Sequence, residues 1–313
     1  MSVFAPFYYK KFKCIADRCR HSCCIGWEID IDPKTYKKYK NLSGEFSLRL
    51  KNNMEETNGQ GSFILGENER CPFLNDKNLC DIIINLGEDM LCDICTLHPR
   101  FQNDFDTFSE IGLGLSCEEA TRIILSAEEK FSISLLEEEN EFLPSGEERD
   151  FLDFRQGLFD IINDTKMTAE EKAEELLKSV GEEPFEKTYS EWKEMFLSLE
   201  CLDDAWHDLL KNLDKENVHT DYNFDGAFSN ILAYFIYRHL SVAYYTCEYK
   251  EAVAFSVLGY KIIRKIYEGS SYKTEKEAFF NLLEIARMYS SEIEYSEENT
   301  QKLFDIFAKG INE

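Results

Sequence analysis

The sequence predicts a mainly α-helical protein in which a Cys-rich, metal-binding N-terminal region of short irregular elements packs on a C-terminal helical bundle. Nine of the eleven cysteines fall within the first 117 of 313 residues. From about residue 118 onward, helix-start signals and apolar residues spaced by three and four recur. With 43% hydrophobic and 14% aromatic residues, the chain has enough apolar surface for a packed interior. We therefore expect two domains, a metal-cluster region over residues 1–122 and a helical domain over residues 123–313.

Short elements are expected in the N-terminal part. Asp32 followed by Pro33 is typical of a helix start, because Asp caps the first turn and Pro fits its first position. It predicts a short helix over residues 33–42. The turn-rich residues 52–62 are expected to form an exposed loop. Two short extended pieces around a polar turn predict a small hairpin over residues 71–84.

Helix-start signals recur in the second part of the chain. A Ser or Thr that suits the N-cap, followed by Glu and then by apolar residues at helical spacing, occurs at Ser116, Thr168, Thr274 and Ser296. Residues 249–267 show the same apolar spacing. These segments predict the helices of the bundle.

The longest apolar stretch, residues 228–247, approaches the length of a membrane span. Arg238 and His239 lie at its centre, where polar groups would be expensive in lipid. We therefore expect a buried core helix in which both side chains are structural polar residues. The opening residues lack a long apolar core with a cleavage site, so we expect a cytoplasmic protein.

Charge is distributed unevenly along the chain. The net charge is −25, which argues against non-specific binding of nucleic acid or of an anionic membrane. Residues 1–60 carry 11 basic and 7 acidic side chains, so the acidity lies in the remainder. This acidic part would attract a basic protein partner through its long-range field.

The spacing of the cysteines predicts a bound metal. Disulfides do not persist in a reducing cytosol, so a dense group of thiols indicates metal ligation or redox chemistry. An iron–sulfur cubane takes four cysteines, and structural zinc takes four ligands, often as paired Cys-x2-Cys. The first group, Cys14-x4-Cys19-x3-Cys23-Cys24, does not have the zinc spacing. We therefore expect an iron–sulfur cluster, with zinc and structural or redox-active thiols as alternatives, and with His98 as an alternative ligand.

The residues around these cysteines form recognisable segments, which include Cys24-Ile-Gly-Trp27, Cys71-Pro-Phe-Leu, Leu79-Cys80, Pro99-Arg100 and Leu115-Ser116-Cys117. These segments resemble those of the flagellin lysine N-methylase family, which is related in pattern to cysteine-cluster proteins described as iron or zinc chelators. Order, spacing and flanking residues agree over about residues 8–125.

The likeness is weaker elsewhere. The helical part is similar to the family only around Asn230 and Tyr237-Arg238. The chain also departs from the family pattern in having Cys92 and His98. These departures bear on the substrate more than on the metal site.

The resemblance implies an S-adenosylmethionine-dependent methyltransferase that acts on lysine ε-amines of flagellin and requires a [4Fe–4S] cluster. The ligands it implies are drawn from Cys14, Cys19, Cys23, Cys24, Cys71, Cys80, Cys95 and Cys117. The pocket residues it suggests for the cofactor are Trp27, Arg100 and Glu110. It assigns no catalytic residue, and which four cysteines bind the cluster stays open.

A second function class remains open. The motifs of Rossmann enzymes, P-loop enzymes, zinc proteases and α/β-hydrolases are absent from the sequence. The alternative is a non-enzymatic iron- or zinc-chelating or redox-sensing protein whose helical part docks a partner.

Overall fold

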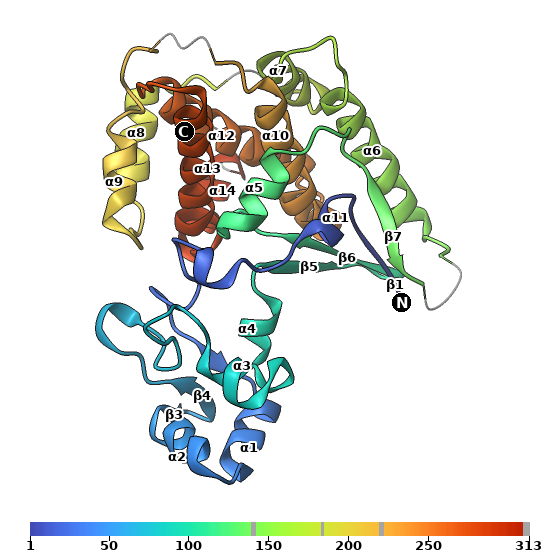
Figure 1. Ribbon diagram of the computed structural model, residues 1–313. Coiled ribbons are helices and arrows are strands. Elements are labelled where there is room, and N and C mark those ends of the chain that lie inside the picture. The colour runs from blue at the N-terminus through green and yellow to red at the C-terminus, as the bar shows by residue number, and fades with distance from the viewer. Residues whose placement is uncertain (139–141, 183–184, 219–221, 309–313) are drawn as a thin grey trace. The chain divides into compact units, whose positions relative to one another are not determined.

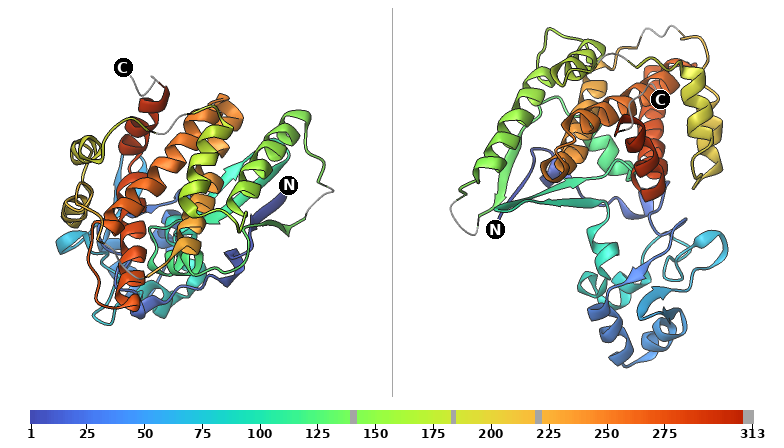
Figure 2. Two further views of the ribbon diagram at one scale, coloured as in Figure 1. Left: turned by 90° about the horizontal axis from the view of Figure 1, so that it is seen from above. Right: turned by 180° about the vertical axis from the view of Figure 1, so that it is seen from behind.

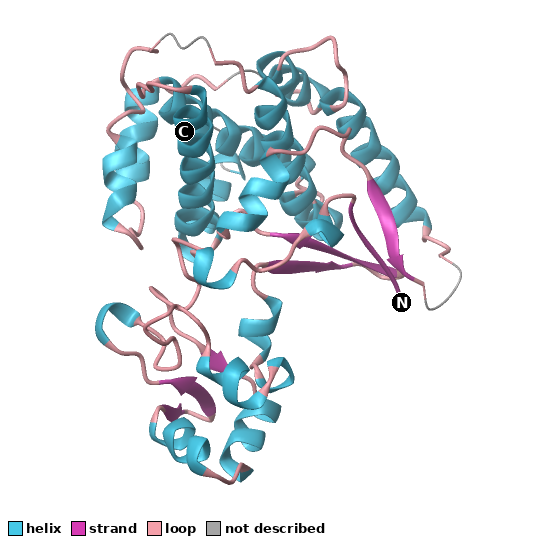
Figure 3. Ribbon diagram, in the orientation of Figure 1, coloured by secondary structure: helices cyan, strands magenta, loops and turns pink. Residues whose placement is uncertain are grey.

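The computed structural model describes residues 1–138, 142–182, 185–218 and 222–308. The chain divides into two compact units (Figure 1). Lys13–Phe101 form one, here called the Cys-rich unit, and Met1–Phe12 with Gln102–Glu313 form the other, here called the helical unit. The mainly α-helical fold is confirmed, with a small sheet in each unit (Figure 3). The predicted division into residues 1–122 and residues 123–313 stays a prediction.

The Cys-rich unit consists of short elements around a small core. Its elements are η2 (Ala16–Arg18), β2 (Asp30–Ile31), α1 (Pro33–Asn41), α2 (Glu45–Asn52), β3 (Met54–Thr57), β4 (Gln60–Phe63), η3 (Glu67–Glu69), α3 (Asp81–Leu86), η4 (Glu88–Met90) and α4 (Asp93–Leu97). The strands form an antiparallel sheet in the order β2-β4-β3. Buried apolar side chains from α1, α2 and the sheet form the core together with several cysteines.

Two predictions in this unit are settled by local geometry. Helix α1 starts as expected, with Asp32 Oδ1 accepting the Thr35 N–H at 2.8 Å. The loop predicted over residues 52–62 is wrong, because β3 and β4 form a hairpin there. Its two-residue turn is Asn58-Gly59, and both residues have positive φ, 53° and 85°. That conformation suits Asn-Gly, which joins strands in the tightest hairpins.

The hairpin predicted over residues 71–84 is only partly present. Leu74 and Cys80 pair as an antiparallel bridge, and Asn75 Oδ1 closes the turn by accepting the Leu79 N–H at 3.1 Å. The second piece, however, becomes helix α3 directly after Cys80. Asp81 opens this helix and is held by Arg49 at 2.6 Å, a long-range contact that a local pattern does not contain.

The helical unit combines a four-stranded sheet with helices. The sheet order is β5 (Arg100–Asp104), β6 (Phe108–Leu113), β1 (Ser2–Pro6), β7 (Ile133–Glu137), with β1 parallel to β6 and antiparallel to β7. After the short η1 (Tyr9–Lys11), the helices are α5 (Glu118–Leu125), α6 (Gly146–Ile162), α7 (Ala169–Ser179), α8 (Tyr189–Leu197), α9 (Asp204–Leu210), α10 (Asp225–His239), α11 (Ser241–Thr246), α12 (Tyr249–Glu268), α13 (Glu275–Tyr289), the π-helical turn η5 (Ser290–Glu294) and α14 (Glu297–Ala308).

Helix α10 is the centre of this unit. It packs against α12 and also contacts α5, α6 and α7, and Figure 2 shows the helices of this unit from two further sides. Its residues from Ala227 to Tyr237 are almost all buried, which confirms the first part of the core helix predicted over residues 228–247. The prediction is wrong for the second part, because α10 ends at His239 and the separate α11 follows, with Val242 and Tyr245 exposed. None of the helices in the described ranges has the length and apolar character needed to span a lipid bilayer.

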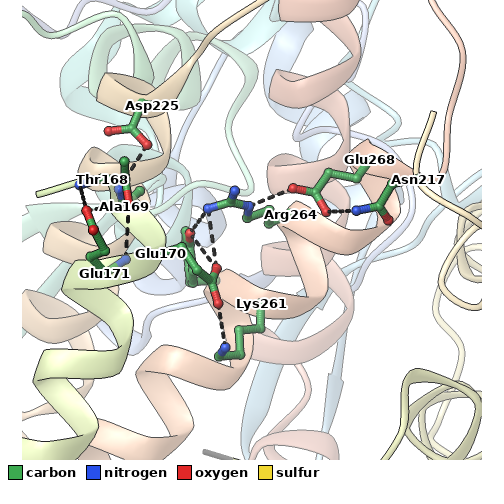
Figure 4. A network of polar contacts seen from close by, with 10 residues as sticks. Thr168, Ala169, Glu170, Glu171, Asn217, Asp225, Lys261, Arg264 and Glu268 are labelled. Atoms are coloured by element: carbon green, nitrogen blue, oxygen red, sulfur yellow. Dashed lines mark hydrogen bonds and ion pairs between the residues drawn. The ribbon is translucent and has the colours of Figure 1, made fainter. Parts of the chain in front are cut away.

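The predicted helix starts are confirmed where the side chain of the predicted residue caps the helix. Thr168 and Glu171 form the expected capping box of α7, and Thr274 caps α13. Helix α5, by contrast, has Cys117 at its N-cap and not Ser116, without a capping side chain. Ion pairs join two of these helices: Glu170 of α7 pairs with Lys261 and Arg264 of α12 at 2.8 and 3.3 Å (Figure 4).

Candidate functional site

Five cysteines share the core of the Cys-rich unit. Cys71 and Cys92 are buried in it, and the half-buried Cys24, Cys80 and Cys95 pack against it. None of the eleven cysteines, all of which lie within the described residues, forms a disulfide. The five come from four segments that are distant in the sequence, so the fold gathers them.

Backbone pairing explains how the first three come together. The Cys71 N–H donates to the Cys24 carbonyl at 2.8 Å, and Ile25 forms an antiparallel bridge with Arg70. The turn that follows brings Cys80 back beside Leu74, three residues after Cys71. Cys80 then occupies the N-cap of α3.

Helix α4 supplies the other two thiols. Cys92 is its N-cap and Cys95 lies within it, with the two Sγ atoms 3.4 Å apart. Asp32 Oδ2 accepts the Asp93 N–H at 3.0 Å and so ties the start of α4 to the start of α1. The Tyr39 hydroxyl of α1 also donates to the Met90 carbonyl just before α4.

The thiols influence one another electrostatically. Burial, together with the nearby Cys24, Cys80 and Cys92, raises the pKa of Cys71 to about 12. The contact with Cys92 raises the pKa of Cys95 strongly, whereas the same contact lowers the pKa of Cys92. A hydrogen bond with Cys23 lowers the pKa of Cys24 to about 7. The pKa values of Cys71 and Cys95 are therefore raised in part by neighbouring thiols, and a bound cation would favour their thiolate forms.

The donor set suits a soft metal centre. Across the part of the chain that the structure describes, no three His, Cys, Asp or Glu side chains converge as they would on a single metal ion. A zinc ion needs its sulfurs about 2.3 Å from one point, whereas a cubane places each of four thiolates on a different iron atom. The thiols of this unit are sufficient in number and chemistry for the second requirement, and their convergence on a cluster stays a prediction.

Three of the other expected ligands lie outside this group. Cys14 and Cys23 are exposed and Cys19 is half-buried. Cys14 Sγ accepts the Ala16 N–H at 3.4 Å, and the Cys19 thiol donates to the His21 carbonyl at 3.2 Å.

The last expected ligand, Cys117, belongs to the helical unit. It stands at the N-cap of α5, where its carbonyl accepts the Thr121 N–H at 2.9 Å. The ligand roles of Cys14, Cys19, Cys23 and Cys117 stay predictions.

Trp27 and Arg100, two of the residues suggested for the cofactor pocket, contact the loop around Cys23 and the end of α4. The Trp27 indole N–H donates to the Cys23 carbonyl at 2.5 Å, and its ring lies 5.8 Å from that of His98. Arg100 donates to the Thr96 carbonyl at 3.3 Å. Burial lowers the pKa of His98 to about 4, with the Arg100 charge acting in the same direction, so the imidazole is neutral at ordinary pH.

The third, Glu110, lies in the helical unit and is buried. Both of its oxygens accept hydrogen bonds from the Arg155 guanidinium, at 2.5 and 2.6 Å. This bidentate pair engages the carboxylate fully, so a cofactor contact by Glu110 stays a prediction.

A buried polar cluster at the end of α10 contains two residues that the sequence analysis singled out and one that it did not. Arg238 Nε and His239 Nε2 lie 2.8 and 2.7 Å from Glu294 Oε1, which agrees with their expected structural role. Glu294 itself gave no sequence signal. It lies in the π-helical turn after α13, and such turns have no residue pattern of their own.

Comparison with known proteins identifies relatives of the chain. A lysine-N-methylase of Salmonella typhimurium and one of Salmonella choleraesuis are each 29% identical to it over 143 residues, 43% of this chain and 35% of the relative. The flagellar biosynthetic protein FliU of Salmonella muenchen is 29% identical over 136 residues, 40% of this chain and 78% of the relative. The aligned part thus spans about a third of the lysine-N-methylases. No family model and no solved structure matches the chain. The expected resemblance is confirmed by these relatives.

Proposed function

We propose, because this chain is a relative of the lysine-N-methylases and of FliU, that it is a protein-lysine N-methyltransferase. The proposal comprises S-adenosylmethionine as methyl donor, a lysine-bearing protein of the flagellin type as substrate, and a cysteine-held [4Fe–4S] cluster. The observation that carries the methyltransferase is the sequence similarity to proteins of that name. The observation that supports the cluster is the group of five thiols in one core.

The residues of the Cys-rich unit would hold the cluster. Backbone pairing fixes Cys24 beside Cys71, the turn fixes Cys80, and α4 positions Cys95, the member of the Cys92–Cys95 pair that the resemblance implies as a ligand. Thiolate ligation couples metal binding to folding, so this unit gains stability when it is loaded.

Methyl transfer sets requirements on the substrate and on the protein. When bound, S-adenosylmethionine would supply the methyl group from its cationic sulfonium sulfur. The substrate lysine must be neutral to act as a nucleophile, which requires desolvation or a base. The net charge of −25 favours the approach of a lysine-rich protein surface.

One observation favours a second function. The Cys92 and Cys95 sulfurs are in contact, and a Cys-x2-Cys pair of this kind suits metal chelation or thiol redox chemistry without methyl transfer. In that case the chain is an iron- or zinc-binding or redox-sensing protein.

Purification without oxygen separates the two functions. We expect the protein to contain iron and sulfide, to bind S-adenosylmethionine saturably by calorimetry, and to transfer labelled methyl groups to flagellin. Cys71→Ser should lose the iron, whereas Cys201→Ser, a matched change in the helical unit, should keep it. Tightly bound zinc without sulfide would overturn the cluster, and absent S-adenosylmethionine binding would overturn the enzyme.

A further inference from the structure

One face of α10 holds the segment over residues 111–127, which contains Cys117. The Asn230 side-chain amide donates to the Ala127 carbonyl at 2.8 Å, after the cysteine. The Tyr237 hydroxyl donates to the Ile111 carbonyl at 3.0 Å, before the cysteine. The two contacts therefore anchor the segment at both of its ends.

A third contact lies between these two. The Leu115 N–H, two residues before Cys117, donates to the Tyr234 hydroxyl at 3.2 Å. The Thr121 hydroxyl, one turn into α5, donates back to the Leu115 carbonyl. Both polar groups of the Leu115 backbone are thereby engaged, and Leu115 is fully buried.

Asn230, Tyr234 and Tyr237 share one face of α10. They are spaced by four and three residues, the spacing that places side chains above one another on a helix. The same face therefore reaches the segment before, beside and after Cys117.

The buried carboxylate of Glu294 sets the direction of the central contact. The Tyr234 hydroxyl donates its proton to Glu294 Oε2 at 2.8 Å, which leaves the hydroxyl oxygen as the acceptor for Leu115. Glu294 is in turn held by the charged side chain of Arg238 at 2.8 Å. Since this network is buried, each of its hydrogen bonds is sheltered from competition by water.

We propose that Asn230, Tyr234 and Tyr237 are positioning residues, which fix the segment over residues 111–127 and thereby the orientation of the Cys117 thiol. This inference rests on the proposed function, in which Cys117 is one of the candidate thiols.

The test compares two substitutions of equally buried tyrosines in the full-length protein. Tyr234→Phe removes the hydroxyl between Glu294 and Leu115 and keeps the ring. Tyr260→Phe is the matched control, since its hydroxyl also donates to a carboxylate, that of Glu170 at 3.2 Å, and lies on α12. After metal removal, each protein is treated with iodoacetamide, and peptide mass spectrometry measures the rate at which the Cys117 thiol is alkylated.

We expect the rate of Cys117 alkylation to rise about two- to tenfold in Tyr234→Phe, because one buried hydrogen bond that holds the segment is lost. The rate should stay unchanged in Tyr260→Phe. Methyl transfer should fall in Tyr234→Phe only, and Tyr237→Phe should show a similar but smaller change. Equal alkylation in the two variants overturns the inference, as does full methyl transfer by Tyr234→Phe. Wild-type protein without methyl transfer would instead defeat the proposed function, and the alkylation result would still report on α10.

Discussion

The buried pair of Glu110 and Arg155 offers a test that separates a structural role from a cofactor role. The two side chains are 1% and 4% exposed and form two hydrogen bonds of 2.5 and 2.6 Å. Burial alone would lower the pKa of Arg155, but the Glu110 carboxylate raises it, so the guanidinium stays charged. Glu110→Gln therefore leaves a buried charge without its partner, which costs about 3–5 kcal/mol of the free energy of unfolding.

The double variant Glu110→Gln, Arg155→Met removes the stranded charge as well. The Met side chain fills a similar volume among the rings of Phe151 and Tyr237, which lie 5.0 and 5.9 Å from the guanidinium carbon. We expect the double variant to recover most of the loss, to within about 2 kcal/mol of the parent protein. Urea unfolding followed by circular dichroism measures both.

The assay also decides the role of Glu110. If Glu110 acts only through this pair, the double variant binds S-adenosylmethionine as the parent protein does. A double variant that regains stability yet fails to bind the cofactor would show that Glu110 contacts it. The structural reasoning itself is refuted if Glu110→Gln alone unfolds at the same urea concentration as the parent protein.

Three further outcomes are expected. Burial raises the pKa of Glu292 to about 7, so between pH 4.5 and about 7 the folded protein holds a proton that the unfolded chain has released. The free energy of unfolding is therefore highest below pH 4.5 and falls by up to about 1.4 kcal/mol per pH unit as the pH rises to about 7. Glu292→Gln should remove this slope in urea titrations at several pH values. Gly61→Ala should destabilise the Cys-rich unit by about 1–3 kcal/mol, because the new Cβ overlaps the Tyr36 ring, whereas Gly146→Ala meets no atom and should not; melting curves compare the two. Removing iron with a chelator should lower the melting temperature of the Cys-rich unit, and an unchanged curve would contradict thiolate ligation.

Local sequence rules predicted the elements whose cause is local. Asp32 caps α1 and Thr168 caps α7, because each interaction spans only three residues. The Asn58-Gly59 turn was also visible in the sequence, but the turn residues around it were interpreted as a loop. The strands of the helical unit were missed for a different reason. Parallel pairing of β1 with β6 joins residues about a hundred positions apart, and no local pattern encodes it.

The candidate site divides in the same way. The sequence identified Cys24, Cys71, Cys80 and Cys95 as candidate ligands, and the fold gathers them around one core. It left Cys92 out, because this cysteine departs from the family pattern, although it is the most buried of the group. Burial depends on which segments meet in the folded unit and therefore could not be inferred from spacing.

The contact between Cys92 and Cys95 distinguishes a cubane from zinc. In a tetrahedral zinc site with Zn–S distances of about 2.3 Å, neighbouring sulfurs stand about 3.8 Å apart, close to the 3.4 Å of this pair. A cubane, however, binds each thiolate at a separate iron atom, so sulfurs in contact cannot both serve it without moving apart. Under the iron–sulfur proposal at most one member of the pair binds the cluster, and the other ligands come from the remaining candidate thiols, which include Cys24, Cys71, Cys80 and Cys117.

Single substitutions then give opposite results for the two metals. Because the family pattern contains Cys95 and not Cys92, we expect Cys92→Ser to retain iron and sulfide and Cys95→Ser to lose both. A structural zinc site would use the pair together, so both variants would lose the metal. Elemental analysis of the two variants, purified without oxygen, measures this directly. Equal loss in both variants would refute the assignment of a single ligand to α4, since two contacting thiols would then be needed at one metal atom.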